Sequence, residues 1–438
     1  MHSHLGSGHS RAAQALADAL RANDPGCRIE LIDFWSLMAP RVAAMLKGGY
    51  LTLVSRDPDA YQRLYRLTAD TWKRYFRGGR LPPPLPEIIE EALAEHFPEV
   101  TGRLPVFRRN LDEAVFTSLM VSLSSRRSLP GVNLLRWGLV LWLRSILIRR
   151  LGQRLGKLKP DAIAITQLFP ANLILGLRAR GKYLDVPTVA IATDHGLHNL
   201  WVRSKVDYYC VPQPEMKEAL VSRGFQPARV FLTGIPLPGG FEQLPTCKEA
   251  RRILGLDPSR PVLLVTGGSY GIGVSDTLKR LLEADDQWQL IATAAGDSEV
   301  AMSFDGIRRR YGDRVRLYEW SDEMPTLMRA ADVVIGKPGG ITVTECLACG
   351  RPFLAICSLG GQELFNTDLL ARYDVGGLIR PETLVSTLRA WLADPDDLAI
   401  RKARAAALGQ PRAAERVALI LEGLTGAGDV DAIQEKIA

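Results

Sequence analysis

Residues 334–366 contain the part of the sequence best suited to bind a charged ligand. Here a buried strand is followed by Gly339 and Gly340 and then by a helix. The two glycines let backbone approach a ligand, and the amide groups and positive dipole end of the helix point at the same place. A diphosphate is the ligand that suits this arrangement.

Glu345 lies in the first turn expected for that helix. Its carboxylate can accept hydrogen bonds from both hydroxyls of a ribose. Thr342 and Glu345 are also spaced as a capping box, in which the carboxylate satisfies backbone amides at the helix start. We favour ribose binding, because the neighbouring motifs supply other parts of a nucleotide-sugar site.

A run of amide and carboxylate side chains follows the helix. Gln362, Glu363 and Asn366 fall within about one turn and suit the hydroxyls of a hexose, although a solvated loop with a helix cap is the alternative. A second strand-to-glycine turn contains Gly268 and Ser269, where backbone amides suit phosphate oxygens. That turn is weak evidence alone, because tight turns commonly use glycine.

A histidine follows two glycines near the start of the chain. Residues 6–9 (GSGH) predict a loop that leads into a helix from Ser10. We therefore expect Gly8 to lie in the loop and to help bind an acceptor substrate, and His9 to be exposed at the helix start, titrating near neutrality. His9 is a candidate base for the proton of an attacking hydroxyl, and a role in binding the acceptor is the alternative.

Residues 193–201 (TDHGLHNLW) place a second polar cluster after a buried strand. His195 and His198 raise the question of a metal site, but further ligands are lacking nearby, so we expect none. We favour an acceptor pocket in which Asp194 and His198 supply polar groups and Trp201 an apolar wall.

Strands and helices alternate along most of the chain. The expected strands span residues 29–32, 162–166, 186–193, 208–211 and 230–233, and then 262–266, 288–294, 315–318, 333–335 and 353–356. Such alternation predicts two mostly parallel α/β sheets with a ligand cleft at the carboxyl ends of their strands. We expect domains at 1–240 and 241–405 and a helical tail at 406–438.

The ends and the cysteines of the chain add further expectations. A glycine loop usually follows a strand of five or six residues, so the five residues before this one indicate that the first strand is missing. No secretory signal and no convincing transmembrane helix are visible. The six cysteines are mostly isolated, and we expect Cys346 and Cys349 to be buried and reduced.

The net charge of +7 is unevenly distributed. Residues 101–160 hold twelve Lys and Arg against two acidic residues. Within them, the apolar and arginine-rich stretch 134–148 predicts a helix in the interface of an anionic membrane, whereas 151–158 reads as an ordinary buried helix. Nucleic acid is a poor alternative, because no recognised binding fold accompanies the charge.

Together these motifs resemble the monogalactosyldiacylglycerol synthase and processive diacylglycerol glucosyltransferase family, within glycosyltransferase family 28. Its members share the two-lobed GT-B fold with the enzyme that makes lipid II. Residues 77–135 exceed the usual length of bacterial relatives. The resemblance rests on residues 6–9, 193–194, His198, Trp201, 206–207, 233–236, 337–340 and 361–363.

The resemblance implies an inverting transfer from a UDP-hexose to the hydroxyl of diacylglycerol at the cytoplasmic face of the membrane, by a peripheral enzyme without a cofactor. It assigns the UDP to Gly268, Thr342 and Glu345 and the sugar to Gln362, Glu363 and Asn366, with His9 on the acceptor side. Plant relatives carry an aspartate where His4 stands here. The alternatives are transfer of N-acetylglucosamine to a polyprenyl-linked precursor, a UDP-sugar epimerase, and a non-catalytic lipid-surface protein.

Overall fold

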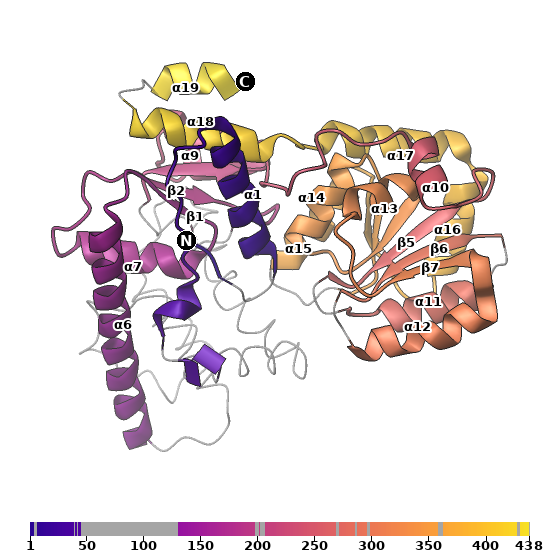
Figure 1. The fold of residues 1–438 in the computed structure, drawn as a ribbon, viewed down its shortest axis with the longest axis horizontal. Coiled ribbons are helices and arrows are strands. Elements are labelled where there is room, and N and C mark those ends of the chain that lie inside the picture. Colours follow the sequence, from indigo (N-terminus) through magenta and orange to yellow (C-terminus); the bar gives the residue numbers. More distant parts are fainter. Residues whose placement is uncertain are drawn as a thin grey trace.

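The protein folds into two α/β lobes, shown in Figure 1. This computed structural model describes residues 1–3, 7–38, 40–41, 43–44, 130–197, 201, 206–268, 271–284, 287–295, 298–357, 362–426 and 430–437. Most of the expected insertion at 77–135, together with His4, His198 and Ser269, lies outside these residues.

The first lobe contains a four-stranded parallel sheet in sequence order, β1-β2-β3-β4. Its strands are β1 (Ile163–Ile165), β2 (Thr188–Ile191), β3 (Tyr208–Val211) and β4 (Val230–Leu232). The helices of this lobe are α1 (Ser7–Asn23), α6 (Pro130–Leu158), α7 (Leu168–Arg178) and α9 (Pro214–Val221). All four strands lie where the sequence predicted them.

Residues 1–3 run beside β1. The amide of Thr166 donates to the carbonyl of Met1 at 3.0 Å, and the amide of His2 donates to the carbonyl of Ile32 at 3.0 Å. The strand expected at 29–32 is wrong, because only a single bridge joins His2 to Asp33 before the 3-10 turn η1 (Phe34–Leu37). The expectation that the first strand of this lobe is missing from the sequence stays a prediction.

The second lobe contains a six-stranded parallel sheet in the order β10-β9-β8-β5-β6-β7. Its strands are β5 (Val262–Thr266), β6 (Gln289–Thr293), β7 (Val315–Tyr318), β8 (Val333–Gly336), β9 (Phe353–Ala355) and β10 (Gly376–Leu378). The helices are α10 (Cys247–Ile253), α11 (Val274–Ala284), α12 (Ser298–Tyr311), α13 (Met324–Ala330), α14 (Gly340–Ala348), α15 (Gln362–Arg372), α16 (Leu384–Ala393) and α17 (Pro395–Leu408).

The central strands of this sheet are buried along their whole length. Every residue of β5, β6 and β8 is buried, which explains why their sequences are continuous apolar runs rather than alternating patterns. Cys346 and Cys349 are buried in the same lobe as free thiols, as predicted.

The last two helices return to the first lobe. Helix α17 packs on α14, whereas α18 (Ala413–Thr425) packs on α1 and α19 (Val430–Ile437) packs on α18, above the first sheet (Figure 1). The contact is apolar: Val417 and Ile420 share a buried cluster with Leu16 and Phe231. The tail expected at 406–438 is therefore helical and completes the core of the first lobe.

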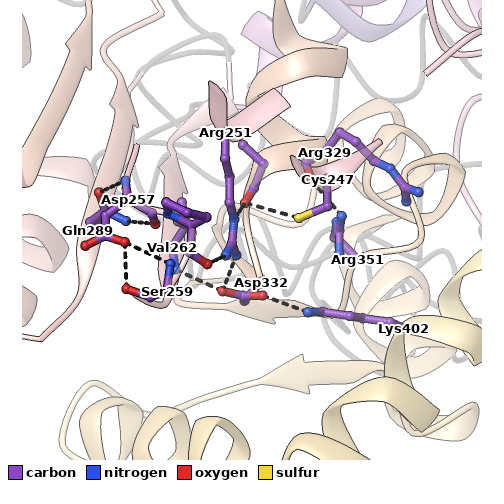
Figure 2. A network of polar contacts seen from close by, with 12 residues as sticks. Cys247, Arg251, Asp257, Ser259, Val262, Gln289, Arg329, Asp332, Arg351 and Lys402 are labelled. Carbon is purple, nitrogen blue, oxygen red and sulfur yellow. Dashed lines mark hydrogen bonds and ion pairs between the residues drawn. The ribbon is translucent and has the colours of Figure 1, made fainter. Parts of the chain in front are cut away.

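A charged network ties together the second lobe at the end of the sheet where β5 and β8 begin (Figure 2). Asp332 lies at its centre, with Arg251 Nη2 at 2.7 Å and Lys402 Nζ at 2.7 Å from its two carboxylate oxygens. The amide of Val262 also donates to Asp332 at 2.9 Å. This network is structural, because the residues predicted for chemistry follow the opposite ends of the strands.

Helix α6 is continuous across the stretch predicted to meet a membrane and the stretch predicted to be buried. Leu151 and Leu155 are 0% and 2% exposed, so the stretch 151–158 buries one face in the lobe, while Gln153, Gly156 and Lys157 on its other face are exposed. Leu147 and Ile148 are also buried in the lobe, so membrane contact cannot extend to the end of the predicted 134–148 stretch. The reason is packing of α6 on α7. No helix among the described residues is long and apolar enough to cross a membrane.

Candidate functional site

Helix α14 begins at Gly340, with Gly339 in extended backbone as its N-cap and no side-chain capping bond. Thr342 is therefore inside the helix, and Glu345 lies in the second turn rather than the first. The capping-box alternative is wrong, because it needs Thr342 at the N-cap. The helix start is thus left with backbone amides that no side chain caps.

Glu345 is a buried carboxylate that faces the first lobe. Its side chain is 2% exposed, and Arg11 of α1 lies with Nη2 at 2.5 Å from Glu345 Oε1. Burial raises the pKa of Glu345, and the guanidinium of Arg11 acts in the opposite direction. The residue predicted to bind ribose is therefore paired with a cation that the sequence did not single out.

Lys337 lies between the glycine turn at Gly268, the glycine turn at Gly339 and the predicted sugar-binding residue Glu363. Its ammonium forms an ion pair with Glu363, and its stem would lie 3.8 Å from a Cβ added at Gly268. Gly268 has a φ of +61°, a conformation that favours glycine. Among the described residues, a Cβ at Gly339 would meet nothing closer than 3.9 Å, so these residues leave the backbone there open to a ligand.

Asn366 is fully buried and joins the lobes. Its Oδ1 accepts from the amide of His195 at 2.9 Å, while its Nδ2 donates to Asp194 at 3.2 Å and to the carbonyl of Pro338 at 2.9 Å. The amide is thus used within the protein in this arrangement. Its contact with a sugar stays a prediction, as does that of the half-buried Gln362.

Gly340 permits a close approach between the lobes. A Cβ at this position would lie 2.0 Å from the carbonyl oxygen of Thr193 and 2.8 Å from Asp194 Oδ1. Gly8 of the first lobe also lies close to the second lobe, because a Cβ added at this position would lie 3.3 Å from Ile341 Cγ1. Both glycines contact the other lobe, a constraint that the sequence could not reveal.

His9 is held in one tautomer by the end of β1. Helix α1 starts at Ser7, so Gly8 and His9 lie in its first turn and not in a loop. His9 Nδ1 donates to the carbonyl of Thr166 at 2.6 Å and lies 3.0 Å from Thr193 Oγ1. The proton on Nδ1 leaves a lone pair on Nε2.

The expected exposure and titration of His9 are wrong. The ring is half-buried, and burial lowers its pKa to about 4, although the hydrogen bond to Thr166 acts to raise it. The physical reason is that the helix starts at Ser7, three residues earlier than predicted, and packs its first turn against the ends of β1 and β2. His9 is therefore neutral at pH 7, in the state required of a base.

Asp194 follows Thr193, the residue whose hydroxyl lies 3.0 Å from His9 Nδ1. Burial raises the pKa of Asp194 to about 7, the hydrogen bond from Asn366 lowers it, Glu363 raises it and Lys337 lowers it. His195 uses both ring nitrogens, with Nε2 at 3.0 Å from Thr344 Oγ1 and Nδ1 at 3.2 Å from Gln213. The segment after β2 is thus docked onto α14 and α15.

Trp201 is 6% exposed and belongs to the core of the first lobe, and its carbonyl accepts from the hydroxyl of Tyr209 at 2.5 Å. Its role as a wall of the acceptor pocket stays a prediction.

Two residues of the site, Arg11 and Thr166, were not identified from the sequence. The sequence offered one indication of Arg11, because it follows the candidate base His9 by two residues in the same helix. It offered no indication of Thr166, because a contact through a backbone carbonyl does not depend on the residue type.

Two family models of known proteins match parts of the chain. Residues 134–237 match the family model of monogalactosyldiacylglycerol (MGDG) synthase, and residues 262–417 match the glycosyltransferase family 28 C-terminal domain. The family resemblance drawn from the motifs is confirmed over these ranges.

Two curated relatives have related sequences. A processive diacylglycerol beta-glucosyltransferase of Bacillus subtilis (strain 168) is 31% identical over 255 residues, which cover 57% of this chain and 65% of the relative. The enzyme of the same name from Bacillus licheniformis is 32% identical over 256 residues, with the same two coverages. The chain thus spans less than two thirds of the length of these relatives.

Among solved structures, Acinetobacter baumannii MurG has a TM-score of 0.50 and 17% identity, covering 65% of this chain and 79% of that one. At this identity the likeness concerns the fold alone. The two parallel-sheet lobes are those of GT-B glycosyltransferases, as the sequence predicted.

Proposed function

We propose that this chain, which carries an MGDG synthase domain followed by a family 28 C-terminal domain, is an inverting glycosyltransferase that moves a hexose from a UDP-sugar to the hydroxyl of diacylglycerol. The observation that carries the proposal is the meeting of donor-side and acceptor-side groups across the lobes. Arg11 of the first lobe pairs with Glu345 of the second, and Gly340 of the second lobe closely approaches Thr193, whose hydroxyl lies 3.0 Å from His9 Nδ1. The names of the two Bacillus relatives support diacylglycerol as acceptor.

The donor side suits a nucleoside diphosphate sugar. The uncapped amides at the start of α14 and the ammonium of Lys337 are placed to balance the charge of a diphosphate. Glu345 accepts the ribose hydroxyls, and Glu363 with Gln362 accepts those of the hexose. The backbone of Gly268, Gly339, Gly340 and Thr342 lines the diphosphate side, and the predicted contact of Ser269 lies outside the described residues.

In the transfer, the lipid hydroxyl attacks the anomeric carbon as the bond from that carbon to the UDP oxygen breaks. His9 takes the hydroxyl proton on Nε2, because Nδ1–H is held by Thr166. One glycosidic bond forms on the face opposite the leaving UDP, which inverts the anomeric centre. Asp194 is the second candidate for this proton, since its pKa of about 7 also suits a base. The reaction needs no bound metal or other cofactor.

The enzyme acts as a peripheral protein at the cytoplasmic face of an anionic membrane. A cavity of about 300 Å³ between α6 and α7 supports this part of the proposal, because Arg149, Arg180 and Lys182 line it together with apolar Ile148 and Leu177. None of the three cations has an ion pair among the described residues. Such a lining suits the phosphate of a lipid headgroup.

The proposal is tested by the release of UDP in three reactions. UDP-glucose, UDP-galactose and UDP-N-acetylglucosamine are each incubated with the full chain alone, with diacylglycerol in anionic vesicles, and with a polyprenyl-linked precursor. We expect UDP release that requires diacylglycerol. Release or sugar conversion without lipid would favour an epimerase, and release of UDP from UDP-N-acetylglucosamine with the polyprenyl precursor alone would favour the other transferase.

A further inference from the structure

The buried carboxylate of the donor site is neutralised by the opposite lobe. Arg11 lies in the second turn of α1 and Glu345 in the second turn of α14, and 2.5 Å separate Nη2 from Oε1. The Glu345 side chain is 2% exposed and the Arg11 side chain 33%. The ion pair thus joins the two lobes, and its more buried member, Glu345, belongs to the donor lobe.

Arg11 is needed because an isolated buried carboxylate is costly. Removing a charge from water costs several kcal/mol unless a partner compensates for it. Arg11 is the one group among the described residues that acts to lower the pKa of Glu345 against its burial. Helices α1 and α14 also start against each other, with Gly8 beside the side chain of Ile341, so packing of the two helix starts keeps the two charged residues close.

We infer that Arg11 is a positioning residue for the nucleotide: it keeps Glu345 ionised and oriented, so that the remaining lone pairs of the carboxylate accept the ribose hydroxyls. A carboxylate offers about four acceptor sites, and one guanidinium nitrogen occupies only part of them. The inference rests on the proposed function, because it requires Glu345 to bind ribose.

A consequence is that the acceptor lobe contributes to donor affinity. The carboxylate is fully competent only while α1 lies against α14, so nucleotide binding stabilises that arrangement of the lobes. The second chemical option for Arg11 is direct contact with the diphosphate, since a guanidinium has five donors. The two roles differ in what they predict for uridine, which has a ribose but no phosphate.

The experiment compares the binding of UDP and uridine by titration calorimetry. Arg11→Met is expected to weaken both ligands by the same factor, roughly 10- to 100-fold. Arg11→Lys, which keeps the charge, is expected to retain most of the affinity. Arg21→Met is the matched control, because Arg21 lies on the same helix and pairs with Asp18 on the surface. This control is expected to bind like the parent.

A double-mutant cycle separates positioning from mere packing. Once Glu345→Gln has removed the charge, adding Arg11→Met is expected to cause little further loss of affinity. Thermal unfolding of each variant reports on stability separately. Undiminished binding by a folded Arg11→Met variant, or a loss confined to UDP, would overturn the inference. A parent protein that binds neither ligand would overturn the proposed function itself.

Discussion

The Nδ1 atom of His9 lies 2.6 Å from the carbonyl oxygen of Thr166, at the end of β1. A backbone carbonyl can only accept, so the proton resides on Nδ1 and the lone pair on Nε2. The contact joins the first turn of α1 to the sheet and fixes the orientation of the ring. This contact alone gives the histidine the tautomer of a base.

Replacement of His9 tests this role. His9→Ala is expected to lower kcat by about 10²- to 10⁴-fold, because proton removal from the lipid hydroxyl is lost. UDP affinity should be unchanged, since His9 is on the acceptor side. Steady-state kinetics and UDP titration measure the two quantities. Gln14→Ala, an exposed change on the same helix, is the control. A His9→Ala enzyme with parental kcat would exclude the histidine as base.

The pH profile distinguishes His9 from Asp194. A base must be deprotonated, so kcat/KM falls as the pH drops through its pKa. With His9, whose pKa burial lowers to about 4, activity is expected to stay level from pH 8 to pH 5. With Asp194, whose pKa burial raises to about 7, activity would already decline near neutrality. A decline near pH 7 that disappears in Asp194→Asn would assign the proton to Asp194.

Gly340→Ala tests the close approach of the lobes. The new methyl group would lie 2.0 Å from the carbonyl oxygen of Thr193, so the backbone must move. A shift of this size across a reaction site is expected to lower kcat/KM by about 100-fold. Gly306→Ala is the matched control within α12, because its Cβ meets nothing within 4 Å. Equal activities of the two variants would show that the approach is unimportant.

Asp332 tests the structural network of the second lobe. Asp332→Asn is expected to destabilise the protein by about 3 kcal/mol, since Arg251 and Lys402 lose their charged partner. Asp305→Asn, which breaks an exposed pair with Arg308, should cost little. Chemical denaturation of the full chain measures the free energy of unfolding of both variants. A loss for Asp332→Asn no larger than that of the control would contradict this assignment.

The same residue predicts a pH dependence of stability. Burial acts to raise the pKa of Asp332, but Lys402 and Arg251 outweigh it and the folded pKa lies below the ordinary value of 3.8. The unfolded chain therefore binds the proton more readily, and the contribution is lost as the pH falls through the folded pKa. The difference in stability between the parent and Asp332→Asn should shrink at acid pH. A constant difference would exclude linkage through this carboxyl.

The cavity between α6 and α7 predicts charge-dependent membrane binding. Arg180→Glu combined with Lys182→Glu reverses two of its cations and should weaken sedimentation with anionic vesicles, each lost cation costing about 1 kcal/mol. Lys279→Glu with Arg280→Glu makes the same charge change on exposed positions of α11. Equal losses in the two pairs would indicate a general charge effect rather than a site.

The strand pattern could be predicted because buried parallel strands are continuous apolar runs between turn residues. The strand β10 was missed, because two of its three residues, Gly376 and Gly377, are glycines with positive φ values, and glycine is depleted in strands. A Cβ at Gly376 would lie 1.8 Å from the carbonyl oxygen of Phe353, which explains the glycine. That constraint exists only once the sheet is formed.

The sequence identified candidate site residues, but it did not identify the residues that contact them or how deeply they are buried. Motif spacing placed Glu345 after the glycine turn, but the Arg11 partner comes from more than 300 residues away in the sequence. Likewise, the burial of His9 depends on how far α1 extends and on Thr166 at the end of β1. Contacts between lobes have no local periodicity, so no sequence pattern reports them.

The most direct test of the account is the structure of the product. The full chain is incubated with UDP-glucose or UDP-galactose and diacylglycerol in anionic vesicles, and the lipid extract is analysed by mass spectrometry and by the anomeric coupling in NMR. We predict a hexosyl-diacylglycerol whose anomeric configuration is inverted relative to the donor, formed together with one UDP per bond. A retained anomeric configuration, or sugar turnover without any glycolipid, would contradict the account.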